Sequence, residues 1–317
     1  MGKINSWDRP CRVEVEQMVE ELNKVIVGKD RVIRQILCAM LAGGHVLLED
    51  VPGVGKTTLA VGISRVMDLS YRRIQFTPDV MPSDVTGFMM YNKKTNEFEY
   101  KTGAVMTSLL LADEINRTSS KTQSALLEAM EEGSVTVDAV TYPLPAPFFV
   151  LATENPLGSA GTQRLPESQL DRFMIRVSMG YPDLESELQI YQGRQREAME
   201  QVEKIISKED FVKMQQEVAA VELKDNVGRY LTKLVHKTRE HAGIELGLSP
   251  RGGLALVGMA KAYAFLQNRT YVIPEDIADV WEITAAHRIV IGRKGKMSGL
   301  GLAEVFQDVF ASVPMPE

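Results

Sequence analysis

Short apolar runs alternate with helix-like segments over the first 180 residues of the chain. The apolar runs fall at residues 45–48, 71–76, 108–111, 148–151 and 173–177. Between them, residues 119–132 and two segments within 13–43 place apolar side chains at helical spacing. Strands that alternate with helices in this way predict an α/β fold with a parallel sheet, here of five strands.

The pattern changes after residues 180–183. From residue 184 to 290 the chain is helix-rich, and we find no further strand signal. Pro274, which is followed by two acidic residues, is typical of the first turn of a helix. At 317 residues the chain also exceeds the usual size of a single hydrophobic core. We therefore expect an α/β core over residues 1–182 and a small all-helical lid over residues 183–317.

Two segments of the predicted core interrupt the alternation of strands and helices. Residues 86–103 contain two aromatic-rich stretches on either side of a polar turn, and residues 134–143 open with an alternating Ser-Val-Thr-Val. Both patterns are typical of β-hairpins. Before the first hairpin, the prolines within residues 77–84 predict a loop without regular structure.

Composition narrows the class of protein without identifying it. The chain has 44% hydrophobic and 25% charged residues, which is ordinary for a folded globular protein. Its net charge of −6 argues against general nucleic-acid binding, although it does not exclude a local basic pore. Because we find no run of about 18 apolar residues, we expect no membrane span.

Signals for location in the cell are weak. Cys11 and Cys38 lack the spacing of metal ligands, and we interpret them as reduced thiols of a cytoplasmic protein. Residues 1–6 match the myristoylation pattern, which we interpret as a coincidence because no second membrane signal lies nearby. Nothing in the sequence resembles a cleaved signal peptide.

The strongest chemical signal follows the first apolar run. Residues 50–57 match the phosphate-binding loop G-x-x-x-x-G-K-[ST], except that Asp50 replaces the first glycine. Aspartate tolerates left-handed backbone better than most residues, so the turn remains feasible. In such a loop, backbone N–H groups wrap a β-phosphate, Lys56 reaches the β and γ oxygens, and Thr57 offers a hydroxyl to Mg²⁺. The expected nucleotide contacts are Pro52, Gly53, Val54, Gly55, Lys56, Thr57 and Thr58.

Acidic and amide side chains end the next two strands of the predicted sheet. Asp113 can hold Mg²⁺ through its water shell, and Glu114 is placed to orient and deprotonate an attacking water. Asn155 ends the following strand, at the depth where parallel sheets bind ligands, and can hold that water or the γ-phosphate. Guanine is disfavoured as the base, because residues 92–95, the nearest match to Asn-Lys-x-Asp, end in threonine.

Two arginines are candidates for stabilising the γ-phosphate. Arg172 lies 17 positions beyond Asn155, and an arginine in this role is often supplied by a neighbouring subunit. Arg251 begins a helix of the predicted lid and can reach the nucleotide from the lid side. Each is equally compatible with an ordinary surface arginine.

Together these motifs resemble the AAA+ ATPases, which have a P-loop NTPase fold, and specifically the MoxR family. The resemblance covers nearly the whole chain and rests on residues 49–57, 111–117, 121–130, 152–156, 165–173 and 249–251. It implies the following roles: Walker A for Lys56 and Thr57, Walker B for Asp113 and Glu114, sensor 1 for Asn155, the trans-acting arginine finger for Arg172, sensor 2 for Arg251, and adenine contact for Val27 and Gly28. Gln75 is loosely matched to a residue that couples substrate contact to Glu114, and the role of Arg117 stays open.

The resemblance also implies a function. Such proteins are ATP- and Mg²⁺-dependent chaperones that form hexameric rings, with ATP between the core and the lid at a subunit boundary. Many act with a von Willebrand factor A domain protein in complex assembly, maturation or metal insertion. Their hairpins point toward a central pore, where residues 86–103 can grip a client; packing against the subunit body is the alternative.

Three other functions remain open. The first is a metal-chelatase-like motor subunit, which shares a similar architecture. The second is a nucleic-acid motor, which we disfavour because the sequence has no dense basic stripe. The third is a scaffold that binds ATP without turnover, and the intact Glu114 argues against it.

Overall fold

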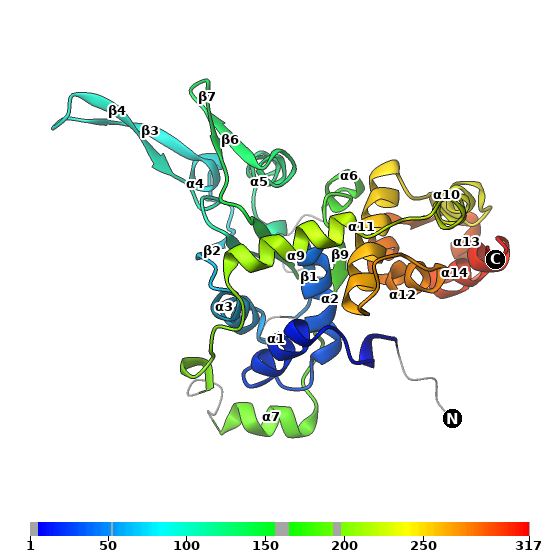
Figure 1. Ribbon diagram of the computed structural model, residues 1–317. Coiled ribbons are helices and arrows are strands. Elements are labelled where there is room, and N and C mark those ends of the chain that lie inside the picture. The colour runs from blue at the N-terminus through cyan, green and yellow to red at the C-terminus, as the bar shows by residue number, and fades with distance from the viewer. Residues whose placement is uncertain (1–5, 52, 156–164, 193–197, 317) are drawn as a thin grey trace.

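The computed structural model describes residues 6–51, 53–155, 165–192 and 198–316 of the chain. Pro52 and residues 1–5 of the N-terminal pattern therefore lie outside the described residues. At the centre lies a five-stranded parallel sheet in the order β2-β5-β8-β1-β9 (Figure 1). Its strands are β1 (Val46–Glu49), β2 (Tyr71–Gln75), β5 (Leu109–Asp113), β8 (Phe149–Glu154) and β9 (Ile175–Val177). The predicted five-stranded parallel sheet is thus confirmed.

The register of the sheet brings the ends of its strands together. Gln75 on β2 lies opposite Asp113 on β5, and Leu48 on β1 lies opposite Thr153 on β8. Because all the strands run in the same direction, their carboxyl ends meet at one edge. The segments that follow β1, β5 and β8 therefore begin next to one another.

The side chains of the sheet feed two hydrophobic clusters, one on each face. On β5, Leu109 and Leu111 join the first cluster while Leu110 and Ala112 join the second, and all four are buried. Helices α1 (Val13–Asn23), α2 (Asp30–Leu41) and α3 (Lys56–Val66) contribute to the first cluster, which continues into the helices of the second half of the chain, and α5 (Ser120–Glu132) contributes to the second. Two covered faces explain why β5 is continuously apolar.

Two hairpins project from the core, as predicted. The first pairs β3 (Gly87–Asn92) with β4 (Glu97–Thr102), and the second pairs β6 (Ser134–Val137) with β7 (Val140–Pro143). Both extend from the same side of the core (Figure 1). At their bases the rings of Tyr100 and Tyr142 stack with centroids 4.1 Å apart. Toward the tip of the first hairpin, Tyr91 and Phe98 are exposed.

The expectation of a loop without regular structure over residues 77–84 is wrong at its end. A short helix, α4 (Pro82–Thr86), begins there. Pro82 occupies the first turn, where its missing N–H would have no partner in the helix, and its fixed φ favours helix entry. A proline that follows a loop can therefore start a helix as well as prevent one.

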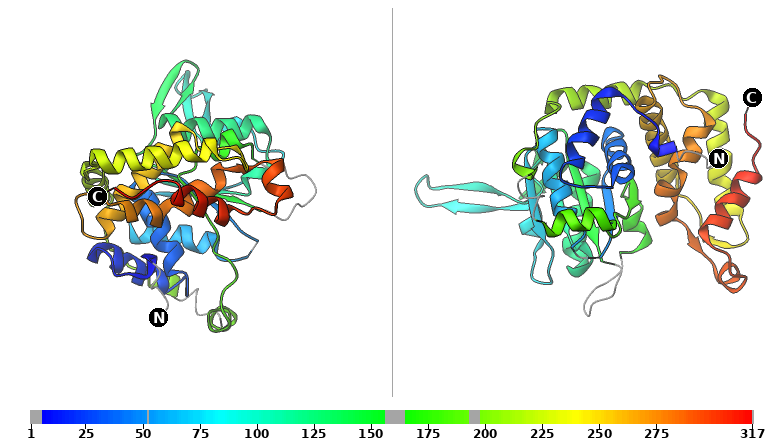
Figure 2. Two further views of the ribbon diagram at one scale, coloured as in Figure 1. Left: turned by 90° about the vertical axis from the view of Figure 1, so that its right-hand side faces the viewer. Right: turned by 90° about the horizontal axis from the view of Figure 1, so that it is seen from below.

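The second half of the chain is mainly helical. Its described helices are α6 (Glu167–Leu170), α7 (Leu184–Tyr191), α9 (Lys208–Ala220), α10 (Asp225–Glu240), α11 (Pro250–Leu266), α12 (Pro274–Ala285), α13 (Arg293–Met297) and α14 (Leu302–Ala311), with the 3-10 turn η3 (Ala286–Arg288). Two further 3-10 turns, η1 (Ser6–Asp8) and η2 (Ile115–Arg117), lie in the first half of the chain. Helices α10 to α14 form a bundle at the end of the molecule opposite the β3–β4 hairpin (Figure 2). One feature was missed: β10 (Ile244–Leu246) and β11 (Val290–Ile291) pair antiparallel, but each is too short to give a strand pattern.

The stretch between the sheet and the bundle returns to the core. Helix α9 crosses the core (Figure 1), and Phe211 on it packs edge-on against Phe149 of β8. Gln215 donates from Nε2 to the carbonyl of Met40 at 2.8 Å. The domain division after residue 182 stays a prediction, and these contacts tie α9 to the core rather than to the bundle alone.

Candidate functional site

The phosphate loop connects β1 to α3 and closes around a lysine. Gly53 and Gly55 have φ values of 88° and 93°, which only glycine adopts readily, and α3 begins at Lys56. Lys56 donates from Nζ to the carbonyls of Asp50 at 2.9 Å and Val51 at 3.1 Å. The free N–H groups at the start of α3 and the lysine together make a positive cradle for phosphate.

Asp50 holds this loop by its side chain. Its backbone is not left-handed, so tolerance of that conformation is not the reason for aspartate here. The carboxylate is buried and accepts from Ser178 Oγ at 2.7 Å and from the N–H groups of Met179 and Gly180 at 2.6 and 3.0 Å. Aspartate therefore ties the start of the phosphate loop to the segment that leaves β9.

The two acids at the end of β5 are held by cations and a hydroxyl. Asp113 accepts from Thr153 Oγ1 at 2.6 Å and from Arg73 Nη2 at 2.7 Å. Glu114 Oε2 accepts from Gln75 Nε2 at 2.9 Å and from Arg117 Nη1 at 2.7 Å. These contacts orient both carboxylates without a nucleotide.

The backbone at Glu114 is unusual. Its φ of 55° and ψ of 49° place a non-glycine residue in the left-handed region, which costs of the order of 1 kcal/mol. The N–H of Glu114 is fixed by Thr153 Oγ1 at 2.8 Å. This strain turns the Glu114 side chain toward the same cavity as Asp113, which fits a residue whose position matters for chemistry.

These residues line one cavity of about 290 Å³, which we call the phosphate cavity. Its lining residues are Gly53, Gly55, Lys56, Thr57, Thr58, Arg73, Gln75, Asp113, Glu114, Thr153 and Asn155. All of them belong to the α/β core. The structure thus brings together most of the predicted phosphate-loop residues, both acids and Asn155.

Two residues of the phosphate cavity were missed by sequence reasoning. Arg73 lies within a predicted strand, where a polar side chain usually indicates only a solvent-facing position, and Thr153 lies just beyond the predicted strand 148–151 but inside the observed β8. The only available signal was their place, two residues before Gln75 and Asn155 respectively. The sheet register is what sets both beside Asp113.

A smaller cavity of about 140 Å³ adjoins the phosphate loop. It is lined largely by apolar side chains, and its lining residues are Ile26, Val27, Lys29, Gly53, Val54, Gly55, Thr58, Met179, Pro182, Ser186 and Ile190. Predicted Val27 is among them. Its neighbour Gly28 has a φ of 73°, and a Cβ there would lie 3.1 Å from Asp183 Oδ2, so glycine is required. An apolar slot beside a phosphate cradle suits a flat purine base.

Lys56 lines the phosphate cavity, and the pKa of its side chain is shifted by its surroundings. Burial lowers the pKa of its ammonium group, and the negative charges of Asp50, Asp113 and Glu114 oppose that shift. A desolvated ammonium group binds phosphate oxygens more strongly than a hydrated one, because less water must be displaced.

The donor set of the phosphate cavity suits a hard cation that is shared with phosphate. Thr57 and Asp113 both line it and offer hydroxyl and carboxylate oxygens, which Mg²⁺ prefers. Over the described ranges there is no group of three or more His, Cys, Asp or Glu side chains that would hold a metal ion by itself. A cation here would therefore need oxygens from the nucleotide and water.

Arg172 and Arg251 lie together in a different cavity, of about 250 Å³, which we call the arginine cavity. Arg172 follows α6 in the core, and Arg251 lies in the first turn of α11 in the bundle. The carboxylate of Glu131, on α5, bridges them: its Oε2 lies 3.5 Å from Arg172 Nε, and its Oε1 accepts from Arg251. Neither arginine is among the described residues that line the phosphate cavity.

The family comparisons agree with this geometry. Residues 45–175 match the ATPase family associated with various cellular activities (AAA), and residues 236–309 match the AAA lid domain. A solved structure of a putative ATPase from Cytophaga hutchinsonii superposes with a TM-score of 0.86 at 38% identity, over 96% of this chain and 95% of that one.

Named relatives narrow the family further. The chain is 49% identical to the uncharacterized protein YeaC of Bacillus subtilis, over 94% of this chain and 93% of that protein. It is 36% identical to chaperone MoxR1 of Mycobacterium tuberculosis, over 96% of this chain and 82% of that protein. The nucleotide-binding geometry and these relatives lead to one conclusion: the chain belongs to the MoxR family of AAA+ ATPases.

Proposed function

We propose that this ATPase hydrolyses ATP only when its subunits assemble into a hexameric ring, and that it uses the energy to remodel a partner protein. The observation that carries the proposal is the separation of Arg172 and Arg251 from the phosphate cavity of their own chain. Phosphoryl transfer needs cationic stabilisation of the γ-phosphate, and an arginine supplied from another subunit is a common source.

Within one subunit, the phosphate cavity supplies binding and water activation. Lys56 and the α3 N-terminus hold the β- and γ-phosphates. Thr57 and Asp113 would hold Mg²⁺, which would neutralise charge on the phosphate oxygens. Glu114 accepts a proton from the attacking water, and Asn155 orients that water.

The carboxylate of Glu114, the proposed base, is held by two donors. In the structure its Oε2 accepts from both Gln75 and Arg117. Both donors bind the same oxygen and fix the orientation of the carboxylate. We infer that Gln75, at the end of β2, releases Glu114 when contact between subunits or with a client shifts that strand.

The arginine cavity shows how a neighbour can complete the site. Arg172 and Arg251 both meet one small anionic group, the Glu131 carboxylate. The Nε of Arg172 has no hydrogen-bond partner within the part of the chain that the structure describes, because 3.5 Å to Glu131 is too long. A γ-phosphate with three oxygens would satisfy these donors better than one carboxylate.

The hairpins are the proposed point of client contact. Phe98, Tyr91 and Met90 on the β3–β4 hairpin are 67%, 45% and 42% exposed, which is unusual for large apolar side chains on a projecting element. Aromatic and methionine side chains adapt to varied apolar surfaces. We propose a von Willebrand factor A domain protein as the partner, in complex assembly, maturation or metal insertion, because the family resemblance implies one.

We also propose a location in the cytoplasm. None of the helices in the described ranges is long and apolar enough to cross a membrane.

Assembly dependence provides the test. The rate of phosphate release per subunit should fall steeply on dilution, in parallel with the loss of hexamers measured by light scattering. A rate per subunit that stays constant in samples containing only monomers would refute the proposal. The partner is tested separately, by whether the Glu114→Gln protein, held in its ATP state, retains a purified von Willebrand factor A domain protein.

A further inference from the structure

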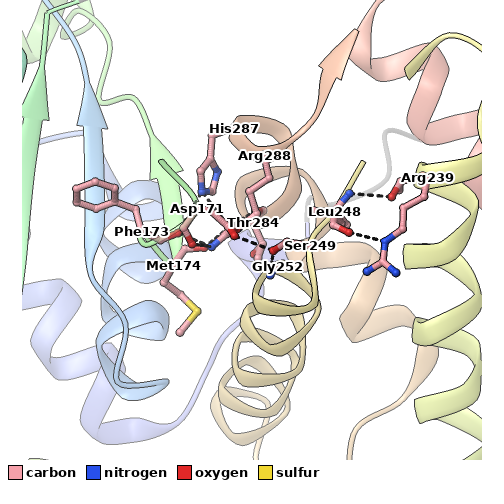
Figure 3. Close-up of polar contacts among 11 residues, drawn as sticks. Asp171, Phe173, Met174, Arg239, Leu248, Ser249, Gly252, Thr284, His287 and Arg288 are labelled. Atoms are coloured by element: carbon pink, nitrogen blue, oxygen red, sulfur yellow. Dashed lines mark hydrogen bonds and ion pairs between the residues drawn. The ribbon is translucent and has the colours of Figure 1, made fainter. Parts of the chain in front are cut away.

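Arg288 is a buried arginine where the helical bundle meets the core. It ends η3 and is only 4% exposed. Its guanidinium donates from Nε to Asp171 Oδ1 at 2.8 Å, from Nη2 to the Asp171 carbonyl at 3.1 Å, and from Nη1 to the Met174 carbonyl at 3.1 Å (Figure 3). It also donates to the carbonyls of Phe173 and Thr284. The planar fork of five N–H donors thus joins residues 171–174 of the core to the end of α12.

Asp171 extends this network to the start of α11. Its Oδ2 accepts from Ser249 Oγ at 2.7 Å (Figure 3). Ser249 is the N-cap of α11, and its hydroxyl oxygen accepts in turn from the N–H of Gly252 at 3.0 Å. Asp171 directly precedes Arg172, and Ser249 lies two positions before Arg251. One carboxylate therefore connects the two segments that carry the arginines.

The fit around these residues is close. A Cβ on Gly252 would lie 3.0 Å from Arg288 Cδ and 3.1 Å from Leu248 Cδ2, so a larger residue would push α11 away from Arg288. Leu248 is itself held from the other side, because its N–H donates to Thr238 Oγ1 at 3.0 Å. Its carbonyl accepts from Arg239 Nε at 2.7 Å (Figure 3). The start of α11 is thus fixed between α10 and the core.

We propose that Asp171, together with Ser249 and Arg288, is a positioning clamp that presents Arg172 and Arg251 as one rigid pair to the γ-phosphate of a neighbouring subunit. We call these three residues the Asp171 clamp. This inference rests on the proposed function of the two arginines. Arg172 stands on the core and Arg251 on the bundle, so any rotation of one part against the other would separate them without the clamp.

The test begins with Asp171→Asn, which keeps the size of the side chain but removes the charge paired with Arg288. Since a displacement of about 1 Å in an active site reduces rates by about 10²-fold, we expect a loss of turnover up to that size. The affinity for ATP, measured with a fluorescent ATP analogue, should stay within twofold, because the phosphate cavity is untouched. A turnover equal to that of the unchanged protein would overturn the inference.

Mixed rings separate positioning from folding. A Glu114→Gln subunit cannot hydrolyse ATP in its own phosphate cavity but has an intact clamp. An Asp171→Asn subunit has an intact phosphate cavity but a broken clamp. When the two proteins are mixed, an Asp171→Asn subunit beside a Glu114→Gln subunit should receive well-placed arginines and turn over several-fold faster. Assembled mixed rings with no gain over Asp171→Asn alone would show that the clamp acts only on its own subunit, against the inference.

Asp276→Asn is the matched control. Asp276 is also a buried aspartate paired with an arginine, and it accepts from Arg269 Nη1 at 2.7 Å, but both residues lie within the bundle region and outside the arginine cavity. This variant should lose stability without losing turnover, and mixing it with Glu114→Gln should give no gain. An equal loss of turnover in both variants would overturn the clamp in favour of a general effect of buried ion pairs.

Two further variants distinguish failure of the clamp from failure of the proposed function. If Asp171→Asn does not assemble, Ser249→Ala can replace it, because it removes one hydrogen bond of the clamp. Ser249→Ala should lose less turnover than expected for Asp171→Asn, and mixing with Glu114→Gln should restore that turnover. A Ser249→Ala protein with neither the loss nor the restoration would overturn the inference. Arg172→Ala mixed with Glu114→Gln tests the proposed function itself. Complementation there, with no defect in Asp171→Asn, rejects the clamp alone, whereas failure there rejects the shared site.

Discussion

The phosphate cavity and the arginine cavity have opposite charge arrangements. In the first, Asp113 and Glu114 are each held by an arginine, Arg73 or Arg117. In the second, two arginines share one carboxylate, Glu131. The first sets a pair of carboxylates beside the positive phosphate loop, and the second sets two guanidinium groups around one small anion. Under the proposed function, one subunit therefore carries both halves of a shared ATP site on separate surfaces.

The charged side chains of the two cavities also differ in how far they are exposed to solvent. The side chains of Asp113 and Glu114 are 13% and 21% exposed, whereas those of Arg172 and Arg251 are 30% and 42% exposed. Groups that act on a ligand inside their own chain are shielded, which strengthens their electrostatic effect. Groups that must reach another molecule need accessibility instead.

Arg172→Ala is the strongest challenge to this division between cavities. It should lower turnover by about 10³-fold or more, because the γ-phosphate loses its cationic partner in the transition state. Mixed with Glu114→Gln subunits, which keep Arg172 but cannot turn over, it should regain turnover, since an intact Arg172→Ala phosphate cavity then meets a neighbour's arginine. Assembled mixed rings with no gain over either variant alone would contradict the comparison.

Glu114→Gln tests the phosphate cavity in the same way. The amide keeps the contacts with Gln75 and Arg117 in part but cannot accept a proton, so turnover should fall by about 10²- to 10⁴-fold. ATP should still bind, as measured by equilibrium dialysis. Asp113→Asn is a useful comparison, because it should lower turnover and also raise the Mg²⁺ concentration needed for half-maximal turnover. Normal phosphate release by Glu114→Gln would reject the base assignment.

The pH dependence of the free energy of unfolding tests the surroundings of His45, which lines the arginine cavity. Burial lowers the pKa of His45 to about 4, and its Nδ1 accepts from the Val150 N–H while Nε2 donates to the Met130 carbonyl. The unfolded chain takes up this proton near pH 6.5, so stability falls as the pH drops from about 6.5 toward 4. Between pH 7 and pH 5 the free energy of unfolding should fall by about 2 kcal/mol from this residue.

The matched variant for that measurement is His45→Gln, which can donate and accept but cannot be protonated. In urea unfolding, its loss of stability from pH 7 to pH 5 should be smaller than that of the unchanged protein by about the same 2 kcal/mol. Some acid sensitivity will remain, because burial also lowers the pKa of His287 well below its usual range. An identical pH dependence in both proteins would show that His45 takes up its proton at the same pH in the folded and the unfolded chain.

Glu131→Gln should give the smallest effect and sharpen the role of the arginine cavity. Glu131 competes with the γ-phosphate for both arginines, and exposed ion pairs contribute about 0.2–1 kcal/mol. Turnover at a fixed, low subunit concentration should therefore rise, by about fivefold at most. Glu132→Gln, the adjacent exposed position on α5, is the control. A fall in turnover would show that Glu131 helps to hold the arginines in place rather than competing for them.

Sequence reasoning located the phosphate cavity well because its residues follow strands of one parallel sheet. Lys56, Glu114 and Asn155 lie on the segments that follow β1, β5 and β8, and a parallel sheet places the carboxyl ends of its strands at one edge. Arg73 and Thr153 escaped notice because they lie inside strands. Their closeness to Asp113 depends on β5 standing between β2 and β8, which no local pattern encodes.

The sequence by itself determined the local chemistry: a glycine-rich loop, two acids and an amide at strand ends, and helices where apolar spacing allowed them. Only the tertiary structure decided which arginine meets which anion. Arg172 and Arg251 are 79 positions apart, and the contacts of Asp171 with Ser249 and Arg288 bring them to one cavity, away from the ATP site of their own chain. The physical reason is that short-range pattern fixes backbone and burial, whereas the docking of a helical bundle on a sheet depends on many weak contacts between distant residues.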